Sequence, residues 1–295
     1  MNHVIDISTK GAVLRVRDGL LSLQFKDEPE VTVPLGEVAA LVLACPQTTL
    51  TQPVLSGLAS AGAAVISCDE RYMPIAMSLP LTGYHAPARR MMAQAKASRP
   101  MCKRLWRQIV RVKVRAQGSL LKELRGDDFG LLAMADLVRS GDAENVEGQA
   151  ARVYWPALFD DVAFLRRTDL ENQNRYLNYG YAVLRAVVAR AICAAGLHPG
   201  LGIFHHHREN AYCLADDLME SLRPVVDRKA VEVTAIAGPD APMDTRVKGM
   251  LLEVATQRYD MEGQKRTLFD VAAIMASSLA MVFEGQRREL ILPEL

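Results

Sequence analysis

Two kinds of hydrophobic periodicity divide the chain. Up to about Leu81, short runs rich in Val, Ile and Leu are separated by turn signals, a pattern typical of β-strands. The predicted strands are His3–Ser8, Ala12–Arg17, Leu20–Phe25, Val31–Val33, Ala39–Ala44, Ala63–Ser67 and Met73–Ser78, with a short helix at Pro53–Ser60. The Asp18-Gly19 step predicts a tight hairpin. Residues 1–81 are therefore expected to form a compact, mostly antiparallel β-domain of β-sandwich type.

Beyond this region the apolar residues recur at helical spacing. Pro80 and Gly83 interrupt regular structure, so residues 82–90 are predicted to be a linker and residues 91–295 a helical domain. The predicted helices are Met91–Leu124, Leu131–Val138, a segment capped by Asn145, Asn174–Ala195, a segment capped by Asn210, and Leu268–Glu284. The expected fold class is α+β, with two domains, of which the larger C-terminal one is all-α.

Length and composition agree with a two-domain globular protein of the cytoplasm. The chain has 295 residues, half of them hydrophobic. No stretch approaches the roughly 18 consecutive apolar residues that a membrane span needs, and no secretory signal precedes the first strand. The five cysteines form no C-x-x-C pair, so they are expected to be thiols rather than a disulfide framework.

Charge is distributed unevenly along a chain whose formal net charge is only +1. From Arg89 to Arg125 there are twelve lysines or arginines and one acid, Glu123, which leaves 23 basic and 33 acidic residues elsewhere. A long segment of one sign fits a phosphate backbone better than a solvated helix face, which usually mixes both signs. A tail or a packing helix is the alternative. The predicted DNA contacts are Arg89, Arg90, Lys103, Arg104, Arg107, Arg111, Lys113 and Arg115.

A second group of residues has the composition of a metal site. Asp216 or Asp217 can share a helix face with Glu220, and such close carboxylates need solvent or a cation between them. Just upstream, the three histidines His205–His207 cannot all face one point, so at most one is expected to be a ligand. One imidazole with several carboxylates suits Mg²⁺ or Mn²⁺ better than structural Zn²⁺. A solvated acidic face beside a surface loop is the alternative.

Glu147 is a single acid near the start of a predicted helix. A carboxylate there is favoured by the helix dipole alone. Spacing gives no reason to place it with the other acids.

Several segments together resemble the motifs of one family. Its glutamate helix, central helix, histidine segment and acidic segments are similar to Glu147–Trp155, Asn178–Leu184, Gly202–His205, Leu214–Glu220 and Arg223–Asp227. The family is that of the integrase subunit of CRISPR spacer acquisition, the first of the CRISPR-associated proteins, and the resemblance extends over essentially the whole chain. The histidine run with Leu43–Thr51 resembles the type II form.

The resemblance implies a catalytic metal site. Glu147, His205 and Glu220 would bind Mg²⁺ or Mn²⁺, with Asp217 as an accessory candidate, and His205 is selected by its Gly-x-x-His spacing from Gly202. The implied reaction is attack by the 3′-hydroxyl of a short double-stranded DNA fragment on a phosphodiester of the CRISPR repeat, without a covalent enzyme intermediate. The basic segment would hold the DNA backbone.

The resemblance also implies partners. The β-domain would form a homodimer, and the small second CRISPR-associated protein would complete a heterocomplex. A type II effector nuclease would contribute to fragment selection, and no membrane is involved. Two other functions remain open: a metal-dependent nuclease whose nucleophile is water, and a DNA-binding scaffold without catalysis.

Overall fold

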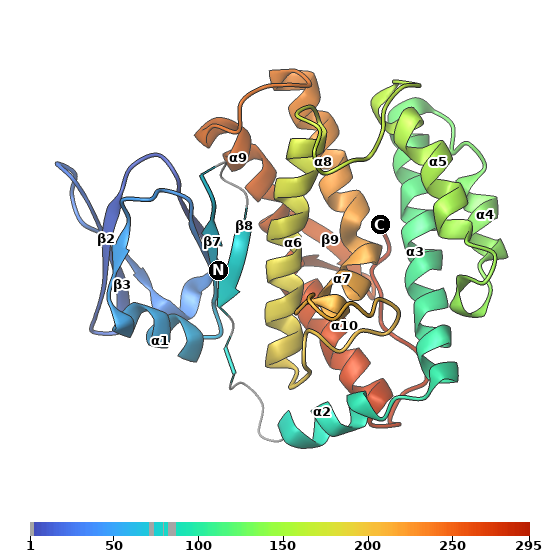
Figure 1. The fold of residues 1–295 in the computed structure, drawn as a ribbon, viewed down its shortest axis with the longest axis horizontal. Coiled ribbons are helices and arrows are strands. Elements are labelled where there is room, and N and C mark those ends of the chain that lie inside the picture. The colour runs from blue at the N-terminus through green and yellow to red at the C-terminus, as the bar shows by residue number, and fades with distance from the viewer. Residues whose placement is uncertain (1–2, 71–73, 79, 82–86) are drawn as a thin grey trace.

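The computed structural model describes residues 3–70, 74–78, 80–81 and 87–295. Figure 1 shows a smaller β-rich part built from the N-terminal residues beside a larger helical part. This arrangement confirms the predicted fold class at the level of a β-domain followed by a larger helical domain.

The β-rich part contains two four-stranded sheets, with the strand orders β1-β5-β7-β8 and β4-β3-β2-β6. Its elements are β1 (His3–Ile7), β2 (Ala12–Arg17), β3 (Leu20–Phe25), β4 (Val31–Pro34), η1 (Leu35–Glu37), β5 (Val38–Leu43), β6 (Thr49–Leu50), α1 (Gln52–Ser60), β7 (Ala64–Cys68) and β8 (Pro74–Ser78). Each predicted strand is present, although Met73, predicted to begin the last one, lies outside the described residues. The hairpin is also confirmed, with Asp18 and Gly19 at φ 50° and 76° between antiparallel β2 and β3.

Strand direction in these sheets is mixed rather than mostly antiparallel. β2 with β3, β3 with β4 and β7 with β8 are antiparallel, whereas β1 with β5, β5 with β7 and β2 with β6 are parallel. The parallel β5 and β7 are connected by a crossover that contains α1, as parallel neighbours require. Alternating hydrophobicity predicts a strand but not its direction, which explains the difference.

The helical part follows. Its elements are α2 (Pro87–Ala95), α3 (Arg99–Arg125), α4 (Leu131–Leu137), η2 (Ser140–Asp142), α5 (Val146–Phe159), α6 (Asn174–Ala194), α7 (Cys213–Met219), η3 (Glu220–Leu222), α8 (Arg223–Ala237), α9 (Thr245–Leu252), η4 (Glu253–Ala255), β9 (Arg258–Met261), β10 (Gln264–Thr267) and α10 (Leu268–Phe283). No described helix has both the length and the apolar character needed to cross a membrane.

Helix α6 is the central element of the molecule. It packs against α7, α8 and α10 on the helical side and against β5, β7 and β8 on the other (Figure 1). At the α8 crossing, a Cβ on Gly180 would lie 2.4 Å from Cγ1 of Val226, so this close approach requires glycine. On the sheet side, Tyr179 donates a hydrogen bond of 3.1 Å to Asp6 of β1. The β-rich and helical parts therefore meet along α6 through both apolar and polar contacts.

Three predictions about the helical part were wrong. The segment Met91–Leu124 is two helices, because Ser98 caps α3 by accepting from Met101 N and Pro100 occupies its first turn. The domain is not all-α, since β9 and β10 form a hairpin whose turn residues, Glu262 and Gly263, both have positive φ.

The third wrong prediction concerns the acidic helix. Asn210 is not its N-cap, since α7 begins after Tyr212, and Asn210 instead accepts from the Tyr212 amide. The helices α8 and α9 were not predicted.

The domain boundary stays a prediction. Of the linker proposed at residues 82–90, residues 82–86 lie outside the described part, and residues 87–90 belong to α2.

Candidate active site

Glu147 is held at the start of α5 by a compact cap. Asn145, at φ 52°, accepts a hydrogen bond from Gly148 N, and Asp142 accepts from the amides of Val146 and Glu147. These contacts satisfy the free amides of the first helical turn. The Glu147 side chain is thereby directed from a fixed backbone position toward α3.

Glu220 begins the short η3 turn between α7 and α8, and it is only 3% exposed. Its Oε1 atom forms an ion pair with Arg223 at 2.8 Å. Burial acts to raise the pKa of Glu220, but the positive charges of Arg223 and Lys113 outweigh it, so the pKa lies below its ordinary value. Glu220 therefore remains ionised inside the protein.

Lys113 of α3 joins the two glutamates. Its ammonium Nζ lies 2.6 Å from Oε1 of Glu147 and 2.6 Å from Oε2 of Glu220. Burial acts to lower the pKa of Lys113, but the charges of Glu220 and Glu147 raise it above its ordinary value. Three elements far apart in sequence thus converge on one ammonium.

His205 is oriented by Asp217, a fully buried residue of α7. Nδ1 of His205 lies 2.6 Å from Oδ1 of Asp217. Because an ionised carboxylate only accepts, Nδ1 carries the hydrogen and Nε2 has its lone pair available in the neutral ring. The hydrogen bond raises the pKa of His205 above its ordinary value, and the charges of Asp217, Glu220 and Glu147 add to this effect.

Asp217 also holds the loop that carries His205. Its carboxylate accepts from the backbone amides of Ile203, Phe204 and His205 at 2.5, 2.8 and 3.1 Å. A Cβ on Gly202 would lie 2.2 Å from the His205 carbonyl oxygen and 3.0 Å from Asp217 Oδ2, so the loop can close on Asp217 only with glycine there. Since both oxygens of Asp217 are engaged, it is placed to position His205 rather than to bind an ion.

The other two histidines are used differently. His207 Nδ1 accepts from the amide of Glu209. His206 lines a cavity of about 410 Å³ together with Lys103, Trp106 and Phe204. The half-exposed Phe204 ring stacks on the buried Trp106, with 4.3 Å between centroids.

Glu147, Glu220 and His205 are the kinds of side chain that bind a divalent ion, but in this structure Lys113 bridges the two glutamates. Two carboxylates and one oriented imidazole are suitable donors for Mn²⁺ or Mg²⁺. In the described part of the chain, no group of three His, Cys, Asp or Glu side chains is arranged to hold a metal ion. The two glutamates instead share a bridging cation, the ammonium of Lys113.

A network that the sequence did not predict lies behind Glu220. Arg223 stacks over the ring of Tyr181 at 4.7 Å from its centroid, and Tyr181 and Tyr154 both donate to the buried Asp227. Burial raises the pKa of Asp227 to about 6, although the tyrosine hydroxyls act to lower it. The spacing of Glu220 and Arg223, three apart on a helical turn, was the one sequence signal for this network.

The predicted basic segment is divided by the structure. Lys103, Arg104, Arg107 and Arg115 are exposed on α3, and Arg111 is half-buried. Arg111 and Arg115 both contact Asp136, and Arg89 pairs with Glu284.

Two members of the segment are not available to DNA at the surface. Arg90 is 6% exposed and donates to the carbonyl of Ala195, and Lys113 is 8% exposed between the two glutamates. The structure therefore does not support the predicted surface contact for Arg90 and Lys113. Net charge along the chain could not reveal this, because it does not report which helix face is buried.

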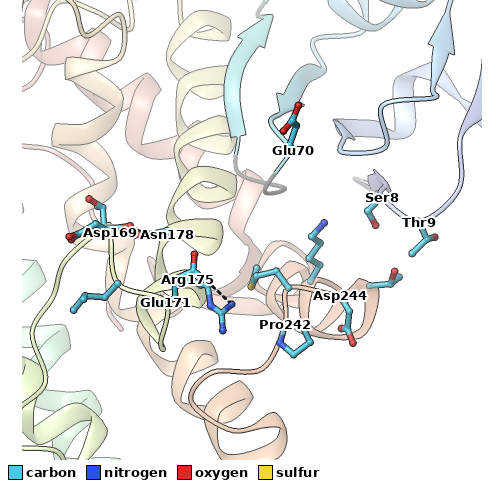
Figure 2. A pocket seen from close by; sticks show the side chains of 14 residues that line it. Ser8, Thr9, Glu70, Asp169, Glu171, Arg175, Asn178, Pro242 and Asp244 are labelled. Carbon is cyan, nitrogen blue, oxygen red and sulfur yellow. Dashed lines mark hydrogen bonds and ion pairs between the residues drawn. The ribbon is translucent and has the colours of Figure 1, made fainter.

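A larger cavity lies elsewhere. It measures about 710 Å³ and lies between Ser8, Thr9 and Glu70 of the β-rich part and residues of the helical part such as Arg175 and Asp244 (Figure 2). Both acidic and basic side chains line this cavity. None of the catalytic, metal-binding or DNA-contacting residues predicted from the sequence lines it.

Comparison with known proteins gives a consistent family match. The family model described as "CRISPR associated protein Cas1" matches residues 5–237. The CRISPR-associated endonuclease Cas1 of Neisseria meningitidis serogroup C (strain 8013) is 36% identical over 268 residues, covering 90% of this chain and 87% of that protein. A Cas1 endonuclease of Pyrobaculum aerophilum is 30% identical, covering 76% and 80%.

Solved structures share the fold. A casposase bound to its integration product has a TM-score of 0.78 at 18% identity, covering 98% of this chain and 92% of that one. A Cas1 protein from Thermotoga maritima has a TM-score of 0.75 at 14% identity, covering 97% and 98%. The chain of a Cas6-RT-Cas1–Cas2 complex has a TM-score of 0.76 at 17% identity, covering 100% and 36%.

Proposed function

The chain belongs to the Cas1 family of CRISPR-associated proteins, and from this premise we propose that it is the integrase of CRISPR spacer acquisition. It joins the 3′-hydroxyl of a short double-stranded DNA fragment to a phosphodiester of the CRISPR repeat. The observation that carries the proposal is that Glu147 of α5 and Glu220 of η3 meet at Lys113. The Asp217-oriented His205, on the loop before α7, is near enough for the charges of both glutamates to raise its pKa.

Glu147, His205 and Glu220 are the residues proposed to hold Mg²⁺ or Mn²⁺. When bound, the ion would lower the pKa of the attacking hydroxyl and neutralise the non-bridging phosphate oxygens. Asp217 fixes the ring of His205 so that Nε2 is presented, and the cap at Asn145 fixes the position of Glu147.

The proposed reaction is a transesterification without an enzyme-linked intermediate. The 3′-oxygen of the fragment loses its proton to solvent and forms a bond to the repeat phosphorus. The bond from that phosphorus to the 3′-oxygen of the repeat breaks, and the departing oxygen takes up a proton. The number of phosphodiester bonds is unchanged, so no external energy source is needed.

The comparisons support the proposed partners at a coarse level. One structural neighbour is a Cas1–Cas2 complex and another is a Cas1–DNA complex, which supports DNA and the small second CRISPR-associated protein as partners. We further propose a homodimer through the β-domain, participation of a type II effector nuclease, and a cytoplasmic location. The DNA backbone is proposed to contact those predicted cations of α2 and α3 that are not buried, namely Arg89, Lys103, Arg104, Arg107, Arg111 and Arg115.

The test uses the full chain, Mg²⁺ or Mn²⁺, a short duplex and a supercoiled plasmid that carries the repeat. The expected result is a covalent fragment–plasmid product that disappears with Glu147→Ala, His205→Ala and Glu220→Ala. If all three variants integrate normally, the proposed site is wrong.

The second candidate is hydrolysis, which the endonuclease names of the relatives favour. The same assay separates it, since cleaved strands without joined products indicate that water is the nucleophile. A protein that binds both DNAs and yields neither product would be a scaffold.

A further inference from the structure

Lys113 occupies the position of a bridging cation between two proposed metal ligands. Its Nζ lies 2.6 Å from an oxygen of each glutamate, and the side chain is almost fully buried. Lysine is rarely buried unless it is paired, and here both partners are residues proposed to bind the ion. An ion placed between the two carboxylates would occupy the position that this ammonium holds.

The charges of the site explain why this replacement is costly. Glu147 and Glu220 carry two negative charges, which Lys113 and Arg223 already balance. Asp217 adds one negative charge, because His205 must be neutral to bind the ion. A divalent ion added to this set would leave one positive charge uncompensated at a largely buried place, which is unfavourable. DNA would supply the missing negative charge, because each phosphate carries one.

We propose that Lys113 is an internal competitor of the divalent ion that makes metal binding depend on DNA. Without DNA, its ammonium holds the two glutamates and keeps metal affinity low. With DNA present, the ammonium moves to a phosphate oxygen, which an unbranched four-carbon side chain permits, and the carboxylates are released to the ion. Metal and DNA then each strengthen the binding of the other by the same factor.

This inference rests on the proposed function for the identity of the metal ligands. Competition with the ion differs from a purely structural role, in which Lys113 only connects α3 to α5 and η3. A structural role predicts that loss of the ammonium lowers stability and weakens or leaves unchanged the affinity for metal. Competition predicts that affinity rises.

The experiment measures Mn²⁺ affinity from the electron paramagnetic resonance signal of free Mn²⁺, without DNA and with a saturating short duplex. The variants are Lys113→Met, which removes the charge, and Lys113→Arg, which keeps it. Lys122→Met, on an exposed position of the same helix, is the matched control. Lys113→Gln replaces Lys113→Met if circular dichroism shows that the latter is unfolded.

The expected result is that Lys113→Met binds Mn²⁺ about tenfold or more tightly than the unchanged protein without DNA. Lys113→Arg and Lys122→Met should keep the low affinity, and DNA should tighten binding less in Lys113→Met than in the unchanged protein. Equal or weaker binding by both Lys113→Met and Lys113→Gln would overturn the inference.

One further variant separates the two proposals. If Glu220→Ala abolishes Mn²⁺ binding while Lys113→Met fails to tighten it, the metal site stands and the competition is refuted. If Glu220→Ala binds Mn²⁺ normally, the ion is held elsewhere and both proposals fail.

Discussion

Two places in the molecule bury a carboxylate near a lysine, and they treat charge in opposite ways. At the candidate active site, the pKa of Glu220 is lowered and that of Lys113 is raised, so both ions are stabilised. Where β1 meets α6, burial raises the pKa of Asp6 and lowers that of Lys248, despite the attraction between them. The charged forms are therefore favoured at the first place and disfavoured at the second.

The difference follows from contact geometry. Each Glu220 oxygen forms an ion pair with a cation, Oε2 with Lys113 at 2.6 Å and Oε1 with Arg223 at 2.8 Å. Among the described residues, Asp6 accepts from the neutral hydroxyl of Tyr179, and its Oδ1 atom has no hydrogen-bond partner. For Asp6 the nearby charge of Lys248 does not offset the cost of burial, whereas for Glu220 two direct contacts with cations do. The surroundings of Glu220 therefore stabilise its charged form, and those of Asp6 do not.

The largest effect is expected from removing a charge at the candidate active site, where the surroundings stabilise the charged side chains. Glu220→Gln retains the shape of the side chain but removes the negative charge that faces Lys113 and Arg223. Integration should fall by roughly a hundredfold or more, measured as covalent fragment–plasmid product. Asp6→Asn is the matched control at the junction, and integration should persist in it. An equal loss in both variants would contradict the distinction between the two places.

The next effect concerns the orientation of His205. Asp217→Asn should lower integration by about 10- to 100-fold, as is usual for residues that orient a metal ligand. The same change should lower the pKa of His205, because the carboxylate that raises it is lost. Titration of the His205 ring followed by nuclear magnetic resonance checks this. An unchanged ring pKa would show that Asp217 does not control the imidazole.

A smaller effect is expected on the exposed face of α3, where charges are solvated and screened. The double change Lys103→Ala and Arg104→Ala should weaken DNA binding for all sequences. It should also reduce the slope of log affinity against log salt by about two. Fluorescence anisotropy at several salt concentrations measures this. The charge-matched control is the double change Lys10→Ala and Lys26→Ala in the β-rich part. A similar loss of slope in this control would contradict the proposal that the exposed face of α3 contacts DNA.

The smallest effect is expected at Asp6 and depends on pH. Because folding raises the pKa of Asp6, its contribution to stability is fully present below its ordinary value of 3.8 and is lost as pH rises through the folded value. The asparagine in Asp6→Asn does not ionise. The Tm of the variant minus that of the unchanged protein should therefore rise by roughly 2–4 °C between pH 4 and pH 7. A Tm difference that is constant over this range would contradict the raised pKa.

Sequence patterns predicted the local elements better than the contacts between them. The strands β2 and β3 and the cap at Asn145 follow from alternation, the Asp-Gly step and capping chemistry, which act within a few residues. Ser98 followed by Pro100 is also a local signal for the start of a helix. It was missed because basic residues continue on both sides of it. The β9–β10 hairpin lacks hydrophobic alternation, so no pattern predicted it.

The candidate site shows the same limit more sharply. The acids and histidines near Glu220 could be grouped from their spacing, whereas Glu147 entered only through family resemblance. Lys113 is 34 residues from Glu147 and 107 from Glu220, so no local pattern connects it to either. Its burial depends on how α3 packs against α5 and η3, which net charge along the chain does not report.

The proposed DNA contacts on α3 cover only part of the helix. They run from Lys103 to Arg115, while Arg99, Lys122 and Arg125 nearer its two ends are exposed as well. At 1.5 Å per residue the stretch from Lys103 to Arg115 measures about 18 Å, the axial length of about five base pairs of B-form DNA. The proposed contact along this helix therefore follows about half a helical turn of duplex, and we expect a longer fragment to need further surfaces of the assembly.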